Sequence, residues 1–347
     1  MKINAVDLFC GIGGLTYGLQ KAGINVIAGI DIVEKCRYAY EKNNNTQFIQ
    51  ADLKKTSYKE IENLYPKDTD VKVLAGCAPC QPFSSYSYRY KNTDSTNKKM
   101  DLLDYFGEFV TKIKPDIVSM ENVPQLSKEP IFKKFIKTLE NNNYKVTWNL
   151  VYAPAYGVPQ NRKRLVLLAS KIGNIKLMDP PFTKEAYPDV YSAIGKLPPI
   201  HAGEYYEKDK LHHSARLNSK NLERIKQSRP GGTWKDWDEK LLLACHKKKS
   251  GNTYRSVYGR MEWHKPSPTI TTQFYGYGNG RFGHPEQNRA ISLREGALLQ
   301  TFPRNYDFGS SIEGKKVNMR EIATQIGNAV PVKLAYYIGK SITQAVR

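Results

Sequence analysis

Short apolar runs alternate with helical patterns along the first 170 residues of this 347-residue chain. The segments between the runs are long enough for crossover helices, and this rhythm is typical of a parallel α/β sheet with helices on both faces. Ligands of such sheets bind at the carboxyl ends of the strands. The expected strands are Ile3–Phe9, Asn25–Asp31, Gln47–Asp52, Val71–Cys77, Asp116–Glu121, Val146–Tyr152 and Leu165–Ala169, and the clearest helices are Leu15–Lys21, Asp101–Ile113 and Ile131–Asn141.

The alternation of strands and helices ends near Ser170. The following stretch is rich in Lys, Arg, Pro, Gly, Tyr and Trp and has no repeating unit. A regular pattern returns at Pro331–Ala345, which predicts an amphipathic helix with proline at its start. We therefore expect a first domain at residues 1–170, a smaller loop-rich domain at 171–290, and a C-terminal segment at 291–347 that returns to the first domain.

Positive charge dominates the composition: 53 Lys and Arg face 33 Asp and Glu, giving a formal net charge of +20. A generally basic, soluble surface is one interpretation of this excess. An excess spread over a whole chain favours a polyanionic partner instead, because each Lys or Arg set against a phosphate releases a counterion. The charge therefore favours nucleic acid as the partner.

The five cysteines are odd in number and scattered, which argues against a disulfide framework. Cys77 and Cys80 have the CxxC spacing of a redox pair or of half a zinc site, but no second pair of ligands follows, so we expect no metal. No stretch approaches the roughly 18 to 20 apolar residues of a membrane span. Asp7 interrupts the N-terminus before a signal peptide could form. We expect no membrane association and a reduced cytoplasmic location.

A glycine-rich turn, Cys10-Gly-Ile-Gly-Gly14, follows the first expected strand. Glycines let a backbone approach a ligand, and the next helix offers free N–H groups, so the turn could hold a nucleotide-like cofactor. It does not match the dinucleotide pattern G-x-G-x-x-G. Asp7, Asp31 and Asp52 lie on or end successive strands, where Asp31 suits ribose hydroxyls and Asp52 an adenine amino group. Each acid alone is more often a helix cap, but three in register predict a cofactor site.

Cys80 lies just past the end of an expected strand, in Gly76-Cys-Ala-Pro-Cys-Gln-Pro-Phe-Ser84. Two prolines fix the backbone around this thiol, and a basic setting lowers the pKa of a cysteine and exposes its thiolate. A buried structural cysteine is the alternative, but the segment is too polar and rigid for that. The pattern predicts a nucleophile.

Glu121 ends another expected strand and should reach the same edge of the sheet as Cys80. A carboxyl that is partly desolvated there can act as a general acid, although a salt bridge or a helix cap would also explain it. Gln160, Arg162 and Arg164 alternate and should share one face of an extended chain. Two guanidinium groups on one face can hold a carboxylate, a phosphate or a base carbonyl, and a solvated strand edge is the alternative.

Taken together, these segments resemble the cytosine-5 DNA methyltransferase family of the bacterial and phage restriction–modification type. The resemblance covers nearly the whole chain in the family's order, and only the stretch near 171–260 is unmatched. Pro268–Thr272 resembles the piece that closes the family's target-recognition domain. The matching segments are Asp7–Gly14, Asp31 and Asp52, Pro79–Gln81, Glu121–Val123, Gln160-x-Arg-x-Arg164, Ser292–Pro303 and Gln325–Pro331.

The resemblance implies a Rossmann-like methyltransferase fold, S-adenosylmethionine as the cofactor, and a role for each matching residue. The implied catalytic residues are Cys80, Glu121, Arg162 and Arg164. The implied cofactor-binding residues are Asp7, Phe9, Gly11, Gly13, Gly14, Asp31, Ile32, Asp52, Leu53, Pro79, Asn328 and Val330. The implied substrate-binding residues are Gln81, Ser84, Asn122, Val123, Gln160, Thr269 and Ile270.

The implied reaction is methyl transfer to C5 of a cytosine that is flipped out of duplex DNA, through a covalent bond between Cys80 and C6. Residues 1–170 would be the catalytic and cofactor-binding domain, and 171–290 the target-recognition domain. The resemblance further implies a monomer in a prokaryotic cytoplasm and a cognate restriction endonuclease that acts on the same site. It does not carry over the target sequence.

Three rival interpretations remain. Relatives that methylate cytosine in transfer RNA share these motifs, but their Cys-Phe-Thr tripeptide is absent here. Asp179-Pro-Pro-Phe182 suggests an adenine-N6 or cytosine-N4 methyltransferase, yet that assignment leaves Cys80 and Glu121 without a role. A DNA-binding module with an inactive methyltransferase fold is the third, and the presence of Cys80, Glu121 and Arg164 argues against it.

Overall fold

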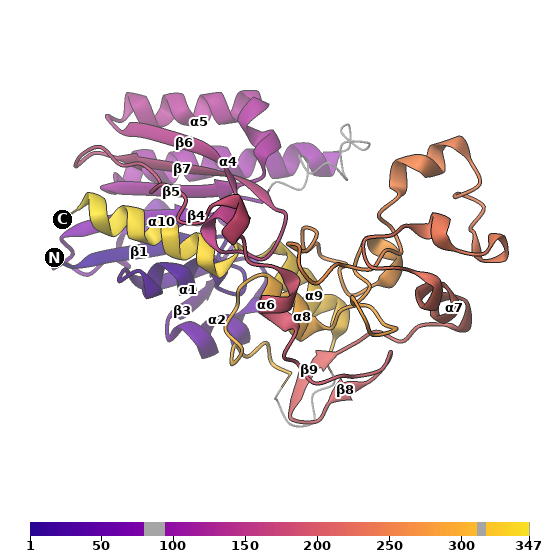
Figure 1. The fold of residues 1–347 in the computed structure, drawn as a ribbon. Coiled ribbons are helices and arrows are strands. Elements are labelled where there is room, and N and C mark those ends of the chain that lie inside the picture. Colours follow the sequence, from indigo (N-terminus) through magenta and orange to yellow (C-terminus); the bar gives the residue numbers. More distant parts are fainter. Residues whose placement is uncertain (80–93, 311–316, 347) are drawn as a thin grey trace. The chain divides into compact units, whose positions relative to one another are not determined.

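The computed structural model describes residues 1–79, 94–310 and 317–346 (Figure 1). The chain forms two compact units. The first unit comprises Met1–Tyr156, Lys163–Pro181 and Val330–Arg347, and the second comprises Gly157–Arg162 and Phe182–Ala329. These units divide the chain differently from the expected segments, because residues 291–329 group with the second unit and only Val330–Arg347 returns to the first. The functional division at 170 and 290 stays a prediction.

A seven-stranded sheet in the order β3-β2-β1-β4-β5-β7-β6 forms the centre of the first unit. All seven strands lie where the sequence predicts them, which confirms the α/β class. Their bounds are β1 Ile3–Leu8, β2 Asn25–Asp31, β3 Gln47–Gln50, β4 Val71–Gly76, β5 Ile117–Asn122, β6 Lys145–Tyr152 and β7 Lys163–Ser170.

The sheet is not wholly parallel as expected, because β7 runs antiparallel to both β5 and β6. A parallel neighbour needs a crossover connection, usually a helix, whereas antiparallel strands can be joined directly. Between β6 and β7 the chain forms only a short 3-10 helix at Ala153–Tyr156 and a loop. Strand β7 therefore returns beside β6 in the opposite direction.

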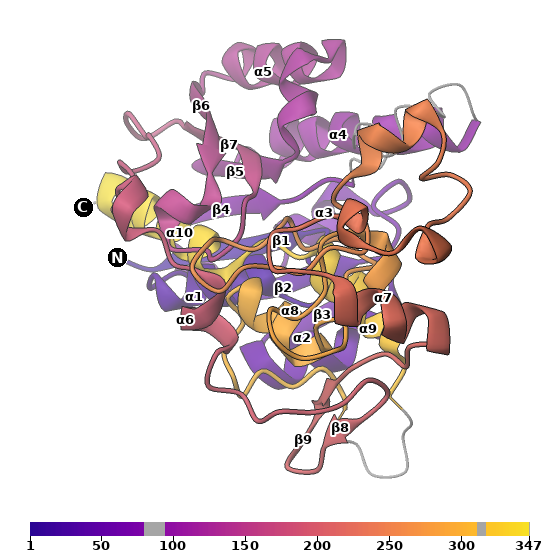
Figure 2. The ribbon, with the colours of Figure 1, turned by 45° about the vertical axis from the view of Figure 1, so that its right-hand side comes forward.

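Helices cover both faces of this sheet because side chains alternate along each strand. Val6 and Leu8 of β1 share an apolar cluster with Phe106 and Phe135, whereas Asp7 between them meets Thr16. Figures 1 and 2 show the helices of the first unit around the sheet. The helices are α1 Gly14–Lys21, α2 Arg37–Asn44, α3 Tyr58–Glu62, α4 Asp94–Ile113, α5 Pro130–Asn141 and α10 Val332–Ala345.

The first and last helices of this unit lie side by side, as Figure 1 shows. Their backbones approach so closely that a Cβ added to Gly18 would lie 2.4 Å from the Cβ of Ala335. At the other end of the contact, a Cβ on Gly339 would lie 2.6 Å from that of Ala22. Only glycine fits at these two positions, so the contact between α1 and α10 depends on both residues.

The second unit contains little regular structure, as its composition predicts. It has two short strands, β8 Tyr205–Tyr206 and β9 Asp209–His213, and four helices within its described residues: α6 Val190–Ile194, α7 Ser219–Gln227, α8 Leu293–Leu299 and α9 Met319–Asn328. Buried polar groups connect its loops. The guanidinium of Arg260 donates to the backbone carbonyls of Ile225, Ser228, His284 and Gln287.

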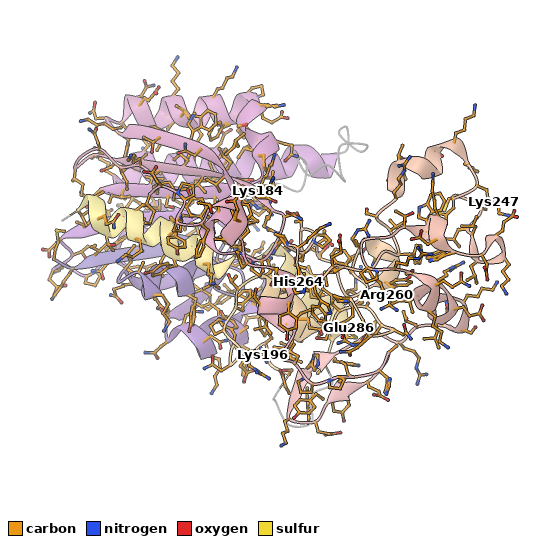
Figure 3. The ribbon with its side chains drawn as sticks, viewed as in Figure 1. Lys184, Lys196, Lys247, Arg260, His264 and Glu286 are labelled. Carbon is orange, nitrogen blue, oxygen red and sulfur yellow. The ribbon has the colours of Figure 1, made fainter. Side chains whose placement is uncertain are left out.

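Figure 3 shows Arg260 within this unit and Lys247 pointing outward from its edge. Arg260 is only 4% exposed, so its four carbonyl contacts replace the water that a guanidinium would otherwise bind. Buried hydrogen bonds therefore connect the loops of the second unit, beside apolar clusters such as Trp234, Trp237 and Leu241. None of the described helices in either unit is long and apolar enough to cross a membrane.

Candidate active site

Four parallel strands bring many of the predicted site residues to one edge of the sheet. The glycine-rich turn follows β1, Asp31 ends β2, Cys77–Pro79 follow β4, and Glu121 and Asn122 end β5. Hydrogen bonds join these chain ends directly: the Gly11 N–H donates to Asp31 Oδ2 at 2.9 Å. The amide of Asn122 donates to the Ala78 carbonyl at 3.1 Å. The sheet thus assembles the site from segments far apart in sequence.

The turn after β1 leaves open space beside its backbone. Phe9, Gly11 and Gly13 have φ angles of 60°, 52° and 85°, in the left-handed region. A Cβ added to Gly11 would meet no atom within 4 Å, whereas one added to Gly13 would lie 2.3 Å from the amide nitrogen of Asn44. Gly14 begins α1. The turn therefore packs on α2 at Gly13 and is bare at Gly11, where a ligand can approach the backbone.

Two carboxyl groups lie under and beside this turn. Asp7 is fully buried, and its Oδ2 accepts from the Thr16 hydroxyl at 2.7 Å while Oδ1 has no hydrogen-bond partner. Burial outweighs the bond from Thr16 and raises the pKa of Asp7 to about 7. Burial also raises the pKa of Asp31, against the effect of N–H donors from Val33 and Gly11.

The remaining predicted cofactor residues differ in exposure. Ile32 is 61% exposed although it is apolar, and it directly follows Asp31. Asp52 uses Oδ1 to accept from the Lys54 N–H at 3.1 Å, and Leu53 is buried in the core of the first unit. Pro79 is exposed. Asn328 lies in the second unit and Val330 in the first, so these last two residues are not placed at one site.

Glu121 is 3% exposed and makes two different contacts through its two oxygens. Oε2 accepts from the Cys77 thiol, with Sγ 3.0 Å away. Oε1 forms an ion pair with Arg164 Nε at 2.9 Å but lacks the directional geometry of a hydrogen bond. Arg164 in turn donates to the Lys163 carbonyl at 2.7 Å. Glu121 is thus a buried carboxyl with one oxygen fixed by Cys77 and the other able to accept a further hydrogen bond.

The contact from Cys77 was not predicted from the sequence. The CxxC spacing pointed to a redox pair or half a zinc site, and among the described residues no group of three or more His, Cys, Asp or Glu could hold a metal ion. Asn122 accepts from the Val123 N–H through Oδ1 at 2.7 Å, and Val123 starts the next turn. Cys80, Gln81 and Ser84 lie outside the described residues.

Of Gln160, Arg162 and Arg164, only Arg164 lies in a strand, and the expectation that the three share one face of an extended chain stays a prediction. Strand β7 begins only at Lys163, so Arg164 belongs to the first unit and the other two residues to the second. The side chain of Gln160 is fully buried and accepts from the Ile270 N–H at 2.9 Å and from Arg162 Nη1 at 3.2 Å. These bonds hold the chain before β7 against Ile270. Thr269 donates to the Asn161 carbonyl.

The family model of C-5 cytosine-specific DNA methylases matches residues 3–344. The chain belongs to this family. It is 51% identical over 340 residues to the Type II methylase M.HgiDII of Herpetosiphon aurantiacus, covering 97% of this chain and 94% of that protein. It is also 29% identical to the Type II methyltransferase M.Sau96I of Staphylococcus aureus, covering 98% of this chain and 75% of the relative.

Solved structures share the fold of this C-5 methylase. A protein described as a prophage-encoded DNA modification methyltransferase from E. coli superimposes with a TM-score of 0.74 at 22% identity, over 99% of both chains. The DNMT2 protein of Spodoptera frugiperda superimposes with a TM-score of 0.68 at 17% identity, over 99% of this chain and all of the other. At these identities the likeness shows the Rossmann-like fold alone.

Proposed function

We propose that this protein transfers a methyl group from S-adenosylmethionine to C5 of a cytosine in a specific duplex DNA sequence. The observation that carries the proposal is the buried Glu121 carboxyl, which is paired with Arg164 and whose Oε1 makes no hydrogen bond within the described residues, so that this oxygen can carry a proton to the base. Glu121 lies at the end of β5. The neighbouring strand β4 is followed by Pro79, which directly precedes Cys80 in the sequence. Membership of the C-5 methylase family supports the choice of cytosine and DNA.

The edge of the sheet fits S-adenosylmethionine, which supplies a methyl group on a sulfonium ion when bound. The bare backbone at Gly11 and the first turn of α1 suit the amino-acid part of such a ligand, and Asp31 suits ribose hydroxyls. The exposed Ile32 side chain suits the face of an adenine ring. Asp7, with a buried oxygen that has no partner, holds the turn from below. Phe9, Gly13, Gly14, Asp52, Leu53, Pro79, Asn328 and Val330 complete the proposed cofactor set.

The proposed chemistry starts from the poor nucleophilicity of cytosine C5. The Cys80 thiolate attacks C6, and Glu121 supplies a proton to ring N3, so that the electron pair of the C5–C6 double bond becomes available at C5. C5 takes the methyl group as the methyl–sulfonium bond breaks, and C5 then loses its proton to solvent. The Sγ–C6 bond breaks to release the thiolate, and N3 returns its proton to Glu121. The ion pair with Arg164 and the thiol of Cys77 fix the Glu121 carboxyl so that Oε1 can serve N3. Arg164 is the proposed partner of the cytosine carbonyl O2, and Arg162 is the other arginine of the proposed catalytic set.

A cytosine stacked in a duplex is out of reach of such groups, so the proposal includes base flipping. Gln81, Ser84, Asn122, Val123, Gln160, Thr269 and Ile270 are the proposed DNA contacts, and residues 171–290 are proposed to choose the target. We further propose that the protein acts as a monomer in a prokaryotic cytoplasm beside a restriction endonuclease of the same specificity.

Nucleoside mass spectrometry tests the proposal. Duplex DNA treated with the protein and S-adenosylmethionine should contain 5-methyldeoxycytidine, and bisulfite sequencing should place it at one recurring sequence. N4-methylcytosine or N6-methyladenine would contradict the proposal; Asp179-Pro-Pro-Phe182, the motif that suggested them, lies in a segment outside any strand. Methylation of transfer RNA in preference to DNA would equally overturn it.

Replacement of Ile32 tests the cofactor site separately. Ile32→Ala should leave thermal unfolding unchanged, because the side chain is 61% exposed and buries little surface in the protein itself. It should weaken S-adenosylmethionine binding by about 1–2 kcal/mol, roughly a five- to thirtyfold increase in Kd, because the apolar contact with the adenine ring is lost. Isothermal titration calorimetry measures this change.

Ile172→Ala is the matched control for that experiment. Ile172 is also apolar and 48% exposed in the first unit. It follows Ser170, which pairs with Ile117 at the start of β5, and so lies at the opposite edge of the sheet. Its replacement should leave cofactor affinity as it is, and an equal effect of the two replacements would rule out a specific contact at Ile32.

A further inference from the structure

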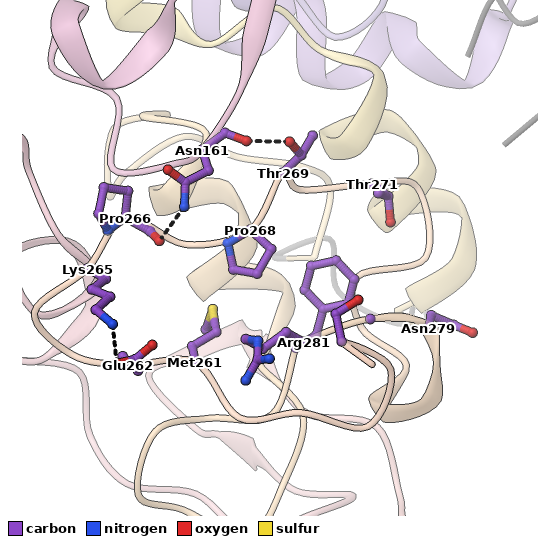
Figure 4. A pocket seen from close by; sticks show the side chains of 13 residues that line it. Asn161, Met261, Glu262, Lys265, Pro266, Pro268, Thr269, Thr271, Asn279 and Arg281 are labelled. Carbon is purple, nitrogen blue, oxygen red and sulfur yellow. Dashed lines mark hydrogen bonds and ion pairs between the residues drawn. The ribbon is translucent and has the colours of Figure 1, made fainter. Parts of the chain in front are cut away.

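A pocket of about 480 Å³ opens on the second unit. Figure 4 shows Arg281 in it, between Met261 and Asn279. The charged residues of its lining are Glu262, Lys265 and Arg281. Lys265 Nζ and Glu262 Oε2 are 2.8 Å apart and offset each other's charge. Arg281 has no carboxylate partner within the part of the chain that the structure describes, so the pocket carries one uncompensated guanidinium.

The backbone holds this guanidinium by one of its ends. Arg281 Nη1 donates to the Gly232 carbonyl at 2.5 Å and more weakly to the Arg260 carbonyl at 3.4 Å. Both bonds use Nη1, so Nε and Nη2 remain available as hydrogen-bond donors. These two nitrogens form the side of the guanidinium that donates two parallel hydrogen bonds to one acceptor pair. The arginine is thus fixed in place with a bidentate donor pair available.

A bidentate donor pair suits two parts of DNA, a phosphate group and the edge of a base. The other residues of the pocket lining favour one of these two ligands. A DNA phosphate offers acceptors only, so it can bond to none of the acceptors in this lining, such as the carboxylate of Glu262. A base edge in the major groove offers both kinds of group: guanine presents O6 and N7 as acceptors, and its partner cytosine presents an amino group as a donor. The hydroxyl of Thr271 and the amide of Asn279 can also both donate and accept.

We propose that this pocket reads a G·C base pair of the target sequence, with Arg281 donating to O6 and N7 of the guanine. The inference rests on the proposed function and adds the residue that selects one base of the site. The pocket includes one of the proposed DNA contacts, because Thr269 is part of its lining. The contacts of Glu262 and Asn279 complete the recognition of the pair.

Arg281→Ala tests this assignment on duplexes that carry the target with one base pair changed at a time. For the unchanged protein, one G·C position should show a loss of kcat/KM when guanine is replaced. For Arg281→Ala, the rate on the original target should fall, and the preference for guanine at that position should shrink by about 10- to 100-fold. Preferences at the other positions should stay as they are.

Two further variants make every outcome decisive. Arg304→Ala is the matched control, since Arg304 is an exposed arginine of the same unit outside the pocket lining and outside residues 171–290, and this variant should keep every base preference. Arg281→Lys keeps the charge but loses the bidentate donor pair, so this variant should also lose the guanine preference. It replaces Arg281→Ala as the test if the alanine variant does not fold. A uniform loss of rate at all positions would identify a phosphate contact and overturn the proposal, as would unchanged preferences. Absence of methylation by the unchanged protein would instead reject the proposed function.

Discussion

Duplex DNA that carries 5-fluorocytosine at the target should become covalently attached to this protein when S-adenosylmethionine is present. Fluorine at C5 cannot leave as a cation, so the elimination that frees the thiolate is blocked after methyl transfer. The adduct should survive denaturing gel electrophoresis, and peptide mapping should place it on Cys80. An enzyme that methylates an exocyclic nitrogen would transfer the methyl group without forming this bond.

Three variants give this trapping experiment its controls. Cys80→Ala should abolish the adduct and still bind DNA, because affinity comes mainly from phosphate contacts. Glu121→Gln should slow adduct formation, since N3 then lacks its proton source. Cys245→Ala should trap DNA like the unchanged protein, although Cys245 is an exposed thiol and the most accessible of the described cysteines. Methylation without a trapped species, or an adduct on Cys10, Cys77 or Cys245, would refute the proposed mechanism.

Glu295→Gln should lower the free energy of unfolding of the second unit by about 3–5 kcal/mol, the usual effect of removing one partner of a buried ion pair. The carboxylate of Glu295 accepts two hydrogen bonds of 2.7 Å from Arg289, and both side chains are 1% exposed. Glu295 also accepts from the Ser292 N–H at 2.6 Å and so caps α8. The amide of glutamine cannot balance the charge of Arg289, which would remain buried and uncompensated.

Urea unfolding followed by tryptophan fluorescence measures the change in the free energy of unfolding of the second unit. Trp148 is the one tryptophan of the first unit, and Trp234, Trp237 and Trp263 belong to the second. In a Trp148→Phe background the signal therefore reports the second unit alone. Glu239→Gln is the control, because Glu239 is 84% exposed and pairs with the exposed Lys247. A surface pair contributes about 0–1 kcal/mol, so an equal effect of both variants would contradict a special role for Glu295.

The difference between Glu295→Gln and the unchanged protein should also depend on pH. Burial by itself would raise the pKa of Glu295, but the charge and hydrogen bonds of Arg289 outweigh it and lower the pKa to about 2. A group whose pKa is lower in the folded than in the unfolded state stabilises the fold above its unfolded pKa. The stabilisation should be complete above pH ~4.5 and decline as the pH falls towards 2.

The strands, and the meeting of the ends of β1, β2, β4 and β5 at one edge, could be predicted because apolar periodicity and parallel connections act locally. The direction of β7 could not be predicted from these local patterns, because it depends on the absence of a crossover helix between the apolar runs of β6 and β7. The hydrogen bond from Cys77 to Glu121 could not be predicted either, because it joins the ends of two strands and neither segment has a sequence pattern that indicates it. The second unit was predictable only as loop-rich, since the hydrogen bonds of Arg260, Arg281 and Arg289 to distant backbone and side-chain groups follow no periodic pattern.

The contact between Gly18 on α1 and Ala335 on α10 sets an order of events during protein synthesis. All seven strands of the central sheet have left the ribosome once Ser170 has emerged, but the surface of α1 around Leu15 and Leu19 still lacks the helix that packs against Gly18. The second unit is translated in the interval and can fold first. The first unit therefore stays incomplete until the last residues of the chain have been translated. A ribosome that stops before Val332 releases a protein without α10, the helix that packs on α1.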